Sequence, residues 1–173
     1  MGARIFGSIV THNLSHAGAM VTLRCVAAVL LLTAVGCKDK EQKSQANSVR
    51  LTPSQGDLPT LLTRELATAK ERNLKPFIEL RAEWCGPCKQ LEGSMGDARM
   101  KDAFAGTYLI SVDIDEWGDA LEPLGFETGS IPVFYELNAQ GKPTGRSING
   151  GAWEENIPQN MAPPLKAFFS GGG

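Results

Sequence analysis

The sequence predicts an α/β domain with a mixed central sheet of about four to five strands, flanked by helices on both faces. Three observations lead to this class. Apolar stretches of strand-like composition alternate along the chain with stretches of helical spacing, which implies parallel strands. The last two strand-like stretches are instead separated by a short turn, which implies an antiparallel hairpin. The composition, with 42% hydrophobic and 21% charged residues, is typical of a soluble globular protein.

The first predicted elements are a helix at 57–73 and a strand at 77–80. Asp57 is a suitable N-cap residue, Pro59 fits the first turn, and leucines recur at helical spacing after it. Pro76 follows the helix and breaks it. The apolar sequence FIEL that comes next has the composition of a strand.

The middle of the domain is predicted to contain short helices and one strand. A helix is expected from about 85 to 92, where glycines begin to interrupt the pattern, and a further turn or two at 97–104. The sequence YLISVD at 108–113 is rich in β-branched and apolar residues, which favours a strand. Residues 117–124 are expected to form a short helix.

The last part of the domain is predicted to be a hairpin followed by a helix. The sequence IPVFYEL at 131–137 favours a strand, NAQG at 138–141 a hairpin turn, and 145–149 the return strand. A closing helix is expected at 161–170, and the glycines at 171–173 are expected to fray.

The first 37 residues resemble an export signal. Residues 25–36 form an apolar, uncharged run of 12 residues, preceded by Arg24. The core of a signal peptide needs about 7–15 apolar residues, whereas a membrane-spanning helix needs about 20. Translation that began at Met20 would give a shorter leader than translation from Met1.

The end of this segment resembles a bacterial lipoprotein signal. Small residues precede Cys37 and a charged stretch follows it, although Ala34 stands where those signals usually carry leucine. The resemblance implies that Cys37 is lipidated and becomes the new N-terminus. Simple secretion and an uncleaved anchor are the alternatives.

Cleavage before Cys37 would leave one domain behind a tether. Residues 38–56 are polar and without period, so we expect a flexible tether, followed by a domain at 57–170. Both histidines, His12 and His16, would leave with the signal. The mature chain would then lack the residues for Ser-His-Asp or Cys-His catalysis and for a histidine-ligated metal. The net charge of −2 argues against a general nucleic-acid binder.

The most informative motif is WCGPCK at 84–89. Cys85 and Cys88 are separated by two residues and can close a small disulfide. If a helix starts at Cys85, its sulfur lies beside free N–H groups and the positive end of the helix dipole, and both favour the thiolate. Cys88 lies one turn further in. We therefore predict that Cys85 attacks or is attacked, and that Cys88 resolves the mixed disulfide.

Three other interpretations of the cysteine pair were weighed. Half of a zinc site would need further ligands, and the mature chain has no second cysteine pair and no histidine. An inert structural disulfide is an alternative in an exported protein, but so small a loop constrains the unfolded chain little. The third alternative is two buried free thiols.

The sequence AEWCGPCK at 82–89 resembles the active-site motif of thioredoxins. The strand before it, the sequence ISVDID after it, and SIPVFYELNAQGK followed by Gly150 and Gly151 occur in the thioredoxin order. The resemblance covers about residues 57–170. It implies a thioredoxin-like three-layer fold, with no cofactor besides the redox disulfide between the two cysteines.

The resemblance assigns substrate binding to six residues. These are Trp84, Gly86, Pro87, Ile131, Pro132 and Gly150. Pro132 is expected in cis beside the disulfide, where it exposes the backbone of Ile131 for pairing with an extended substrate. Trp84 is expected to cover the disulfide, and Gly150 is expected to let a substrate chain approach closely.

Glu79 stands where thioredoxins carry a buried aspartate. Strand alternation predicts that Glu79 points away from the side of Ile78 and Leu80, toward the layer under the active-site helix. A desolvated carboxyl has a raised pKa and can exchange a proton with Cys88 as the disulfide opens. The alternative is a surface glutamate on an edge strand.

Two neighbouring positions depart from the thioredoxin pattern. Ser111 stands where a lysine is often found, so any lysine contribution to proton transfer is missing. Arg81 stands where many thioredoxins have an aromatic residue; it either favours the thiolate of Cys85 or lies in solvent. A group of acidic residues is expected to be a solvated strand end, because the ligand spacing of a hard-cation loop is absent. The group consists of Asp113, Asp115, Glu116 and Asp119.

The sequence therefore predicts an extracytoplasmic thiol–disulfide oxidoreductase that reduces disulfides of protein partners. An upstream electron donor must re-reduce it, since the periplasm is kept oxidising. Gly86 and Pro87 resemble the dipeptide of reducing thioredoxins. We expect a monomer without metal or nucleic acid, anchored by lipid in the periplasm or cell envelope, or else secreted. The alternatives are a disulfide oxidase or isomerase, and a non-catalytic module that binds a client near Pro132.

Overall fold

A computed structural model describes residues 47–171. Within this range one five-stranded sheet has the order β1-β3-β2-β4-β5. Its strands are β1 (Ser48–Leu51), β2 (Lys75–Arg81), β3 (Thr107–Asp113), β4 (Val133–Leu137) and β5 (Pro143–Asn149). Strands β1, β3 and β2 are parallel, whereas β4 is antiparallel to both β2 and β5. The mixed sheet and its final hairpin confirm the predicted fold class.

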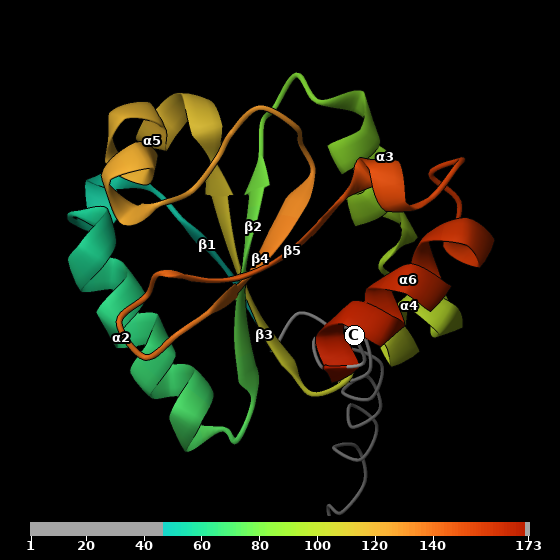
Figure 1. Cartoon of the computed structure of the whole chain (residues 1–173), viewed down its shortest axis with the longest axis horizontal. Helices are drawn as coiled ribbons and strands as arrows, with labels where there is room; N and C mark the ends of the chain where they lie inside the picture. Colours follow the sequence, from blue (N-terminus) through green and yellow to red (C-terminus); the bar gives the residue numbers. More distant parts are fainter. Residues whose placement is uncertain (1–46, 172–173) are drawn as a thin grey trace, which may run out of the picture. The chain divides into compact units, whose positions relative to one another are not determined.

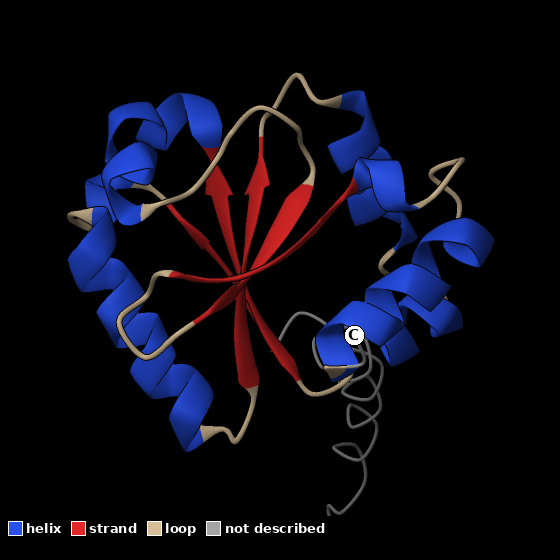
Figure 2. Cartoon of the chain, viewed as in Figure 1, coloured by secondary structure: helices blue, strands red, loops and turns tan. Residues whose placement is uncertain are grey.

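Helices cover both faces of this sheet, as Figure 1 and Figure 2 show. One face carries α2 (Leu58–Glu71) and α5 (Ile114–Leu121), and the other carries α3 (Gly86–Ser94), α4 (Ala98–Ala103) and α6 (Pro158–Ser170). Short 3-10 turns are η1 (Pro53–Gln55), η2 (Glu122–Leu124) and η3 (Gly150–Ala152). The arrangement is the expected three-layer fold.

Side-chain alternation along the central strand β2 separates two apolar cores. Ile78 and Leu80 pack into the core under α2 and α5. Phe77 points to the opposite face and packs into the core under α3, α4 and α6. Glu79 follows Phe77 by two residues and therefore lies on the same face. The alternation thus places a carboxyl group beneath the helix that starts after Cys85.

Aspartate caps determine where several helices begin. The Asp57 carboxylate accepts a hydrogen bond from the backbone N–H of Thr60 at 3.0 Å and starts α2 as predicted. The Asp113 carboxylate accepts from the N–H of Asp115 at 2.9 Å, so α5 begins at residue 114, earlier than the predicted 117. Helix α6 also begins earlier than predicted, because Pro158 fits its first position.

Strand β1 corrects the predicted extent of the tether. Residues 48–51 were assigned to a flexible segment, but they form an edge strand that is parallel to β3. Leu51 is fully buried, and its carbonyl oxygen accepts a hydrogen bond from Trp117 Nε1 at 3.1 Å. The strand was missed because only two apolar residues, Val49 and Leu51, carry its alternation within a polar stretch. At the other end, Gly171 is the C-cap of α6 and not a frayed residue.

Several expectations fall on residues that the structure does not describe. The predicted signal peptide at 1–37 with its Cys37, residues 38–46 of the tether and residues 172–173 of the tail lie outside the described range. Among residues 47–171, no helix has the length and apolar character needed to cross a membrane.

Candidate active site

Cys85 and Cys88 form a disulfide where β2 ends and α3 begins. Cys85 is the N-cap residue of α3, and its Sγ accepts a hydrogen bond from the backbone N–H of Cys88 at 3.1 Å. Gly86 and Pro87 form the exposed first turn between them. When the disulfide opens, the Cys85 sulfur faces the free N–H groups and the positive end of α3, which stabilise a thiolate.

The two sulfurs differ in their access to solvent. Cys85 is 3% exposed, whereas Cys88 is completely buried. Both pack with Ala82 in a small apolar cluster, against the side chains of Ile114 and Ile131. Of the two cysteines, Cys85 is therefore the one with any contact with solvent.

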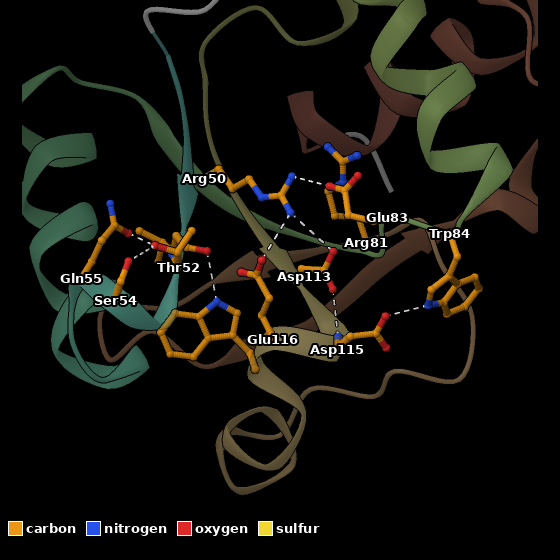
Figure 3. A network of polar contacts seen from close by, with 12 residues as sticks. Arg50, Thr52, Ser54, Gln55, Arg81, Glu83, Trp84, Asp113, Asp115 and Glu116 are labelled. Carbon is orange, nitrogen blue, oxygen red and sulfur yellow. Dashed lines mark hydrogen bonds and ion pairs between the residues drawn. The ribbon is translucent and has the colours of Figure 1, made fainter.

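Trp84 precedes the disulfide and presents its indole to solvent. The side chain is 66% exposed, yet its Nε1 donates a hydrogen bond to Asp115 Oδ2 at 2.7 Å (Figure 3). Sequence reasoning placed Asp115 among the solvated acids and missed this contact. The parallel register of β2 and β3 explains the contact, because it pairs Arg81 with Asp113 and so places the loop after β2 beside the first turn of α5.

Ile131 and Pro132 approach the disulfide from the loop before β4. The peptide bond between them is cis, as expected. Pro132 is buried, Ile131 packs against the cysteine cluster, and the backbone N–H of Gly150 donates to the Pro132 carbonyl oxygen at 3.2 Å. The strand begins only at Val133, since Pro132 has no N–H to contribute to the sheet. Three segments distant in sequence thus meet around the cysteine pair.

Glu79 is buried beneath α3, so the alternative of a surface glutamate is wrong. It is 5% exposed on the central strand β2, and Ser111 Oγ donates a hydrogen bond to its carboxylate. Burial raises the pKa of Glu79, while the Ser111 hydrogen bond and the charge of Arg81 act against this rise. In this disulfide form the carboxyl hydrogen-bonds to Ser111 and not to Cys88, within the described residues.

Arg81 is also buried on this face, which excludes a position in solvent. It is 6% exposed, and its Nη2 lies 3.0 Å from Glu92 Oε2 on α3. The guanidinium therefore lies between β2 and the active-site helix. An ion pair between a buried arginine and an exposed glutamate was not foreseen, because neither residue belongs to a recognisable spacing pattern.

Arg50 connects the edge strand with the loop that carries the motif, as Figure 3 shows. Its Nη1 lies 2.6 Å from Glu83 Oε1, and its Nη2 lies 3.5 Å from Asp113 Oδ2 and 3.7 Å from Glu116 Oε1. Asp113 is 2% exposed, so it is not the solvated acid that the sequence suggested. Sequence reasoning missed Arg50 because it missed β1.

The described part of the chain offers no cluster of metal ligands. Within residues 47–171, no group of three histidine, cysteine or acidic side chains is placed to hold a metal ion. The group able to take up and release electrons is the disulfide itself, which belongs to the chain.

A sequence model of the thioredoxin family matches residues 64–163, which include the cysteine pair, Glu79 and Pro132. The chain belongs to the thioredoxin family. Proteins of this family are in general thiol–disulfide oxidoreductases, and their redox group is a disulfide of the chain.

Curated relatives agree with this family. The chain is 30% identical over 126 residues to the thiol:disulfide interchange protein TxlA of Synechococcus elongatus, covering 71% of this chain and 60% of the relative. It is 29% identical over 93 residues to thioredoxin H2 of Arabidopsis thaliana, covering 54% of this chain and 65% of that one. The chain thus spans less than two thirds of the length of these relatives.

A solved structure supports the fold alone. The disulphide isomerase of Xylella fastidiosa Temecula1 superposes with a TM-score of 0.51 at 20% sequence identity. The superposition covers 70% of this chain and 96% of the isomerase. The fold of this domain therefore matches nearly the whole of that solved chain.

The Trp84 contact can be tested by replacing Asp115 with alanine. We expect the indole N–H proton resonance of Trp84 to move upfield and to exchange faster with solvent, because its acceptor is lost. The free energy of unfolding should fall by about 1 kcal/mol or less, since the bond is exposed. NMR spectroscopy and urea unfolding measure these changes.

Two other indoles serve as internal controls in the same spectrum. Trp117 Nε1 donates to the Leu51 carbonyl oxygen and Trp153 Nε1 to Asn156 Oδ1. Their resonances should stay in place in Asp115→Ala. An unchanged Trp84 resonance would show that Asp115 does not hold the ring.

Proposed function

We propose that this protein is an extracytoplasmic thiol–disulfide oxidoreductase that reduces disulfides of protein partners through Cys85 and Cys88. The observation that carries the proposal is the disulfide at the N-terminus of α3, with Cys88 completely buried and Cys85 slightly exposed next to an exposed tryptophan. A merely structural crosslink would not need this helix position. The name of the TxlA relative, a thiol:disulfide interchange protein, agrees with exchange chemistry.

The proposed reaction moves two electrons from the dithiol to the partner. The Cys85 thiolate attacks one sulfur of the partner's disulfide; a bond forms between them, and the other partner sulfur leaves as a thiolate. The Cys88 thiolate then attacks the Cys85 Sγ. The Cys85–Cys88 bond forms, the mixed disulfide breaks, and the partner leaves with its second sulfur reduced. An upstream dithiol donor restores the starting state.

Glu79 is the proposed acid and base for the buried sulfur. Cys88 must lose its proton before it attacks, and a carboxylate beneath α3 can accept that proton. In the reverse step Cys88 leaves the disulfide as a thiolate and takes a proton from Glu79. Burial raises the pKa of Glu79, so the carboxyl holds its proton more tightly than an exposed glutamate does.

Partner binding is proposed for the surface around the disulfide. The backbone of Ile131, next to Pro132, is the proposed edge for pairing with an extended partner segment. Trp84 supplies an exposed apolar ring, and Gly150 adds no side chain next to Pro132, whose Cδ would lie 3.8 Å from a Cβ at that position. Gly86 and Pro87 complete the surface beside Cys85.

The proposed location is the cell envelope, with Cys37 as the lipidated residue. The apolar run at 25–36 and the small residues before Cys37 support this part of the proposal. Ten residues, 38–47, separate Cys37 from the first strand residue. Fully extended, they would span at most about 35 Å, so the active site would work close to a membrane surface.

Two cysteine variants test the reaction. We expect Cys88→Ser to accumulate a mixed disulfide with insulin, because the resolving sulfur is missing. Cys85→Ser should form none and should reduce insulin only at the rate seen without protein. Non-reducing gel electrophoresis detects the adduct, and turbidity of the released insulin chains measures the rate.

The comparison between the two variants is the control, because each keeps one cysteine in the same fold. Circular dichroism checks that both remain folded. Full insulin reduction by Cys85→Ser would contradict the proposed roles. Wild-type protein that binds a client but never exchanges disulfides would instead favour a non-catalytic module.

The anchor is tested by Cys37→Ser in the full chain. We expect wild-type protein expressed in a Gram-negative host to sediment with membranes and to incorporate labelled fatty acid. Cys37→Ser should lose the label and move to the soluble fraction, since the lipidation site is gone. A label that persists in Cys37→Ser would contradict the assignment, and Cys25→Ser is the matched control that should leave it unchanged.

A further inference from the structure

A cavity of about 410 Å³ lies beneath α3, toward the β1 edge of the sheet. Its wall includes charged or polar side chains from three adjacent strands and from α3. Those used here are Arg50, Glu79, Arg81, Glu92 and Ser111. A buried carboxyl and a buried guanidinium therefore line one cavity behind the active-site helix.

Glu79 and Arg81 are neighbours on one face of β2. Residues two apart on a strand point the same way and lie about 7 Å apart along it. Both are buried, and both line the cavity. One end of the guanidinium is paired, by the contact of Nη2 with Glu92 Oε2 at 3.0 Å.

The Arg81 Nε is buried and has no hydrogen-bond partner among the described residues. A buried donor without an acceptor is costly, so its acceptor is expected in another state of the site. In Figure 3 no dashed line joins Arg81 to Arg50 or Glu83, so the Arg50 network does not supply that acceptor.

Glu79 is the nearby acceptor whose protonation state can change. Its Oε2 accepts a hydrogen bond from Ser111 Oγ. The second carboxylate oxygen can accept from a further donor. A neutral carboxyl tolerates this arrangement, but an ionised one in the same place requires further donors or a cation. Arg81 is the cation on its own strand and lines the same cavity.

We propose that Arg81 is a positioning residue that serves as counter-ion to ionised Glu79, with its Nε–H as the donor for the second carboxylate oxygen. Glu92 holds the other end of the guanidinium and competes for its charge. The use of Glu79 by Cys88 rests on the proposed function, whereas the coupling between Arg81 and Glu79 does not.

The groups around Glu79 shift its pKa in opposite directions, and a measurement can distinguish their effects. Burial raises the pKa of Glu79, the Ser111 hydrogen bond and the Arg81 charge lower it, Glu92 raises it, and Arg50 lowers it. Arg81 and Glu92 thus act with opposite sign, although they form one ion pair. If Arg81 and Glu92 only held the structure together, replacing either one should shift the pKa of Glu79 in the same direction, because either substitution breaks the same ion pair.

The experiment follows the Glu79 side-chain carboxyl carbon by NMR against pH in the full chain, in its disulfide form. Glu79→Gln assigns the signal. We expect the midpoint to shift upward in Arg81→Gln, because the cation is lost, and downward in Glu92→Gln, because Arg81 is then free for Glu79. Arg81→Lys should bring the midpoint part of the way back, since it keeps the charge but not the Nε–H.

Shifts in the same direction for Arg81→Gln and Glu92→Gln would overturn the proposal, as would an unchanged midpoint in Arg81→Gln. If Arg81→Gln does not fold, Glu92→Gln still decides, because the Glu92 side chain is 63% exposed and its loss leaves the core intact. A midpoint that does not fall in Glu92→Gln then contradicts the proposal. Opposite shifts in a protein that fails to reduce insulin would support the Arg81 assignment and reject only the proposed function.

Discussion

The position of Cys85 at the N-terminus of α3 is the constraint on which the rest of the site depends. Its sulfur accepts a hydrogen bond from the helix backbone, and the helix dipole stabilises negative charge there. The same geometry places Cys88 one turn inside, where it is completely buried. One helix start therefore creates two sulfurs of different character, which under the proposed function are the one that meets a partner and the one that resolves the intermediate.

The layer beneath α3 contains polar side chains beside its apolar core. Arg50, Ser111 and Glu79 occupy matching positions on three adjacent strands, so a row of polar groups crosses the sheet behind the disulfide. The ion pair of Arg50 with Glu83 connects this row to the loop before Trp84. The ion pair of Arg81 with Glu92 connects strand β2 to α3. The two buried charges among these residues, Glu79 and Arg81, affect each other's ionisation more than they stabilise the fold.

Most of the fold could be predicted from the sequence, because its local signals agree with one another. Asp57 and Pro59 mark the start of α2, and the alternation around Glu79 correctly placed that side chain under α3. Strand β1 escaped detection because two apolar residues in a polar stretch are too few to define a period. Because β1 was not predicted, the contacts of Arg50 and the burial of Asp113 were not predicted either. Both depend on pairing between residues distant in sequence. The cis bond at Pro132 was foreseen only through the family resemblance.

The reduction potential of the Cys85–Cys88 pair tests the central claim most directly. It is measured by equilibration with a dithiol buffer of known potential. Thioredoxin lies near about −270 mV and a strong periplasmic oxidant near about −120 mV. The proposed reductase requires a value close to the first. A value close to the second would keep the exchange chemistry but make the protein an oxidant, which would contradict the proposed direction.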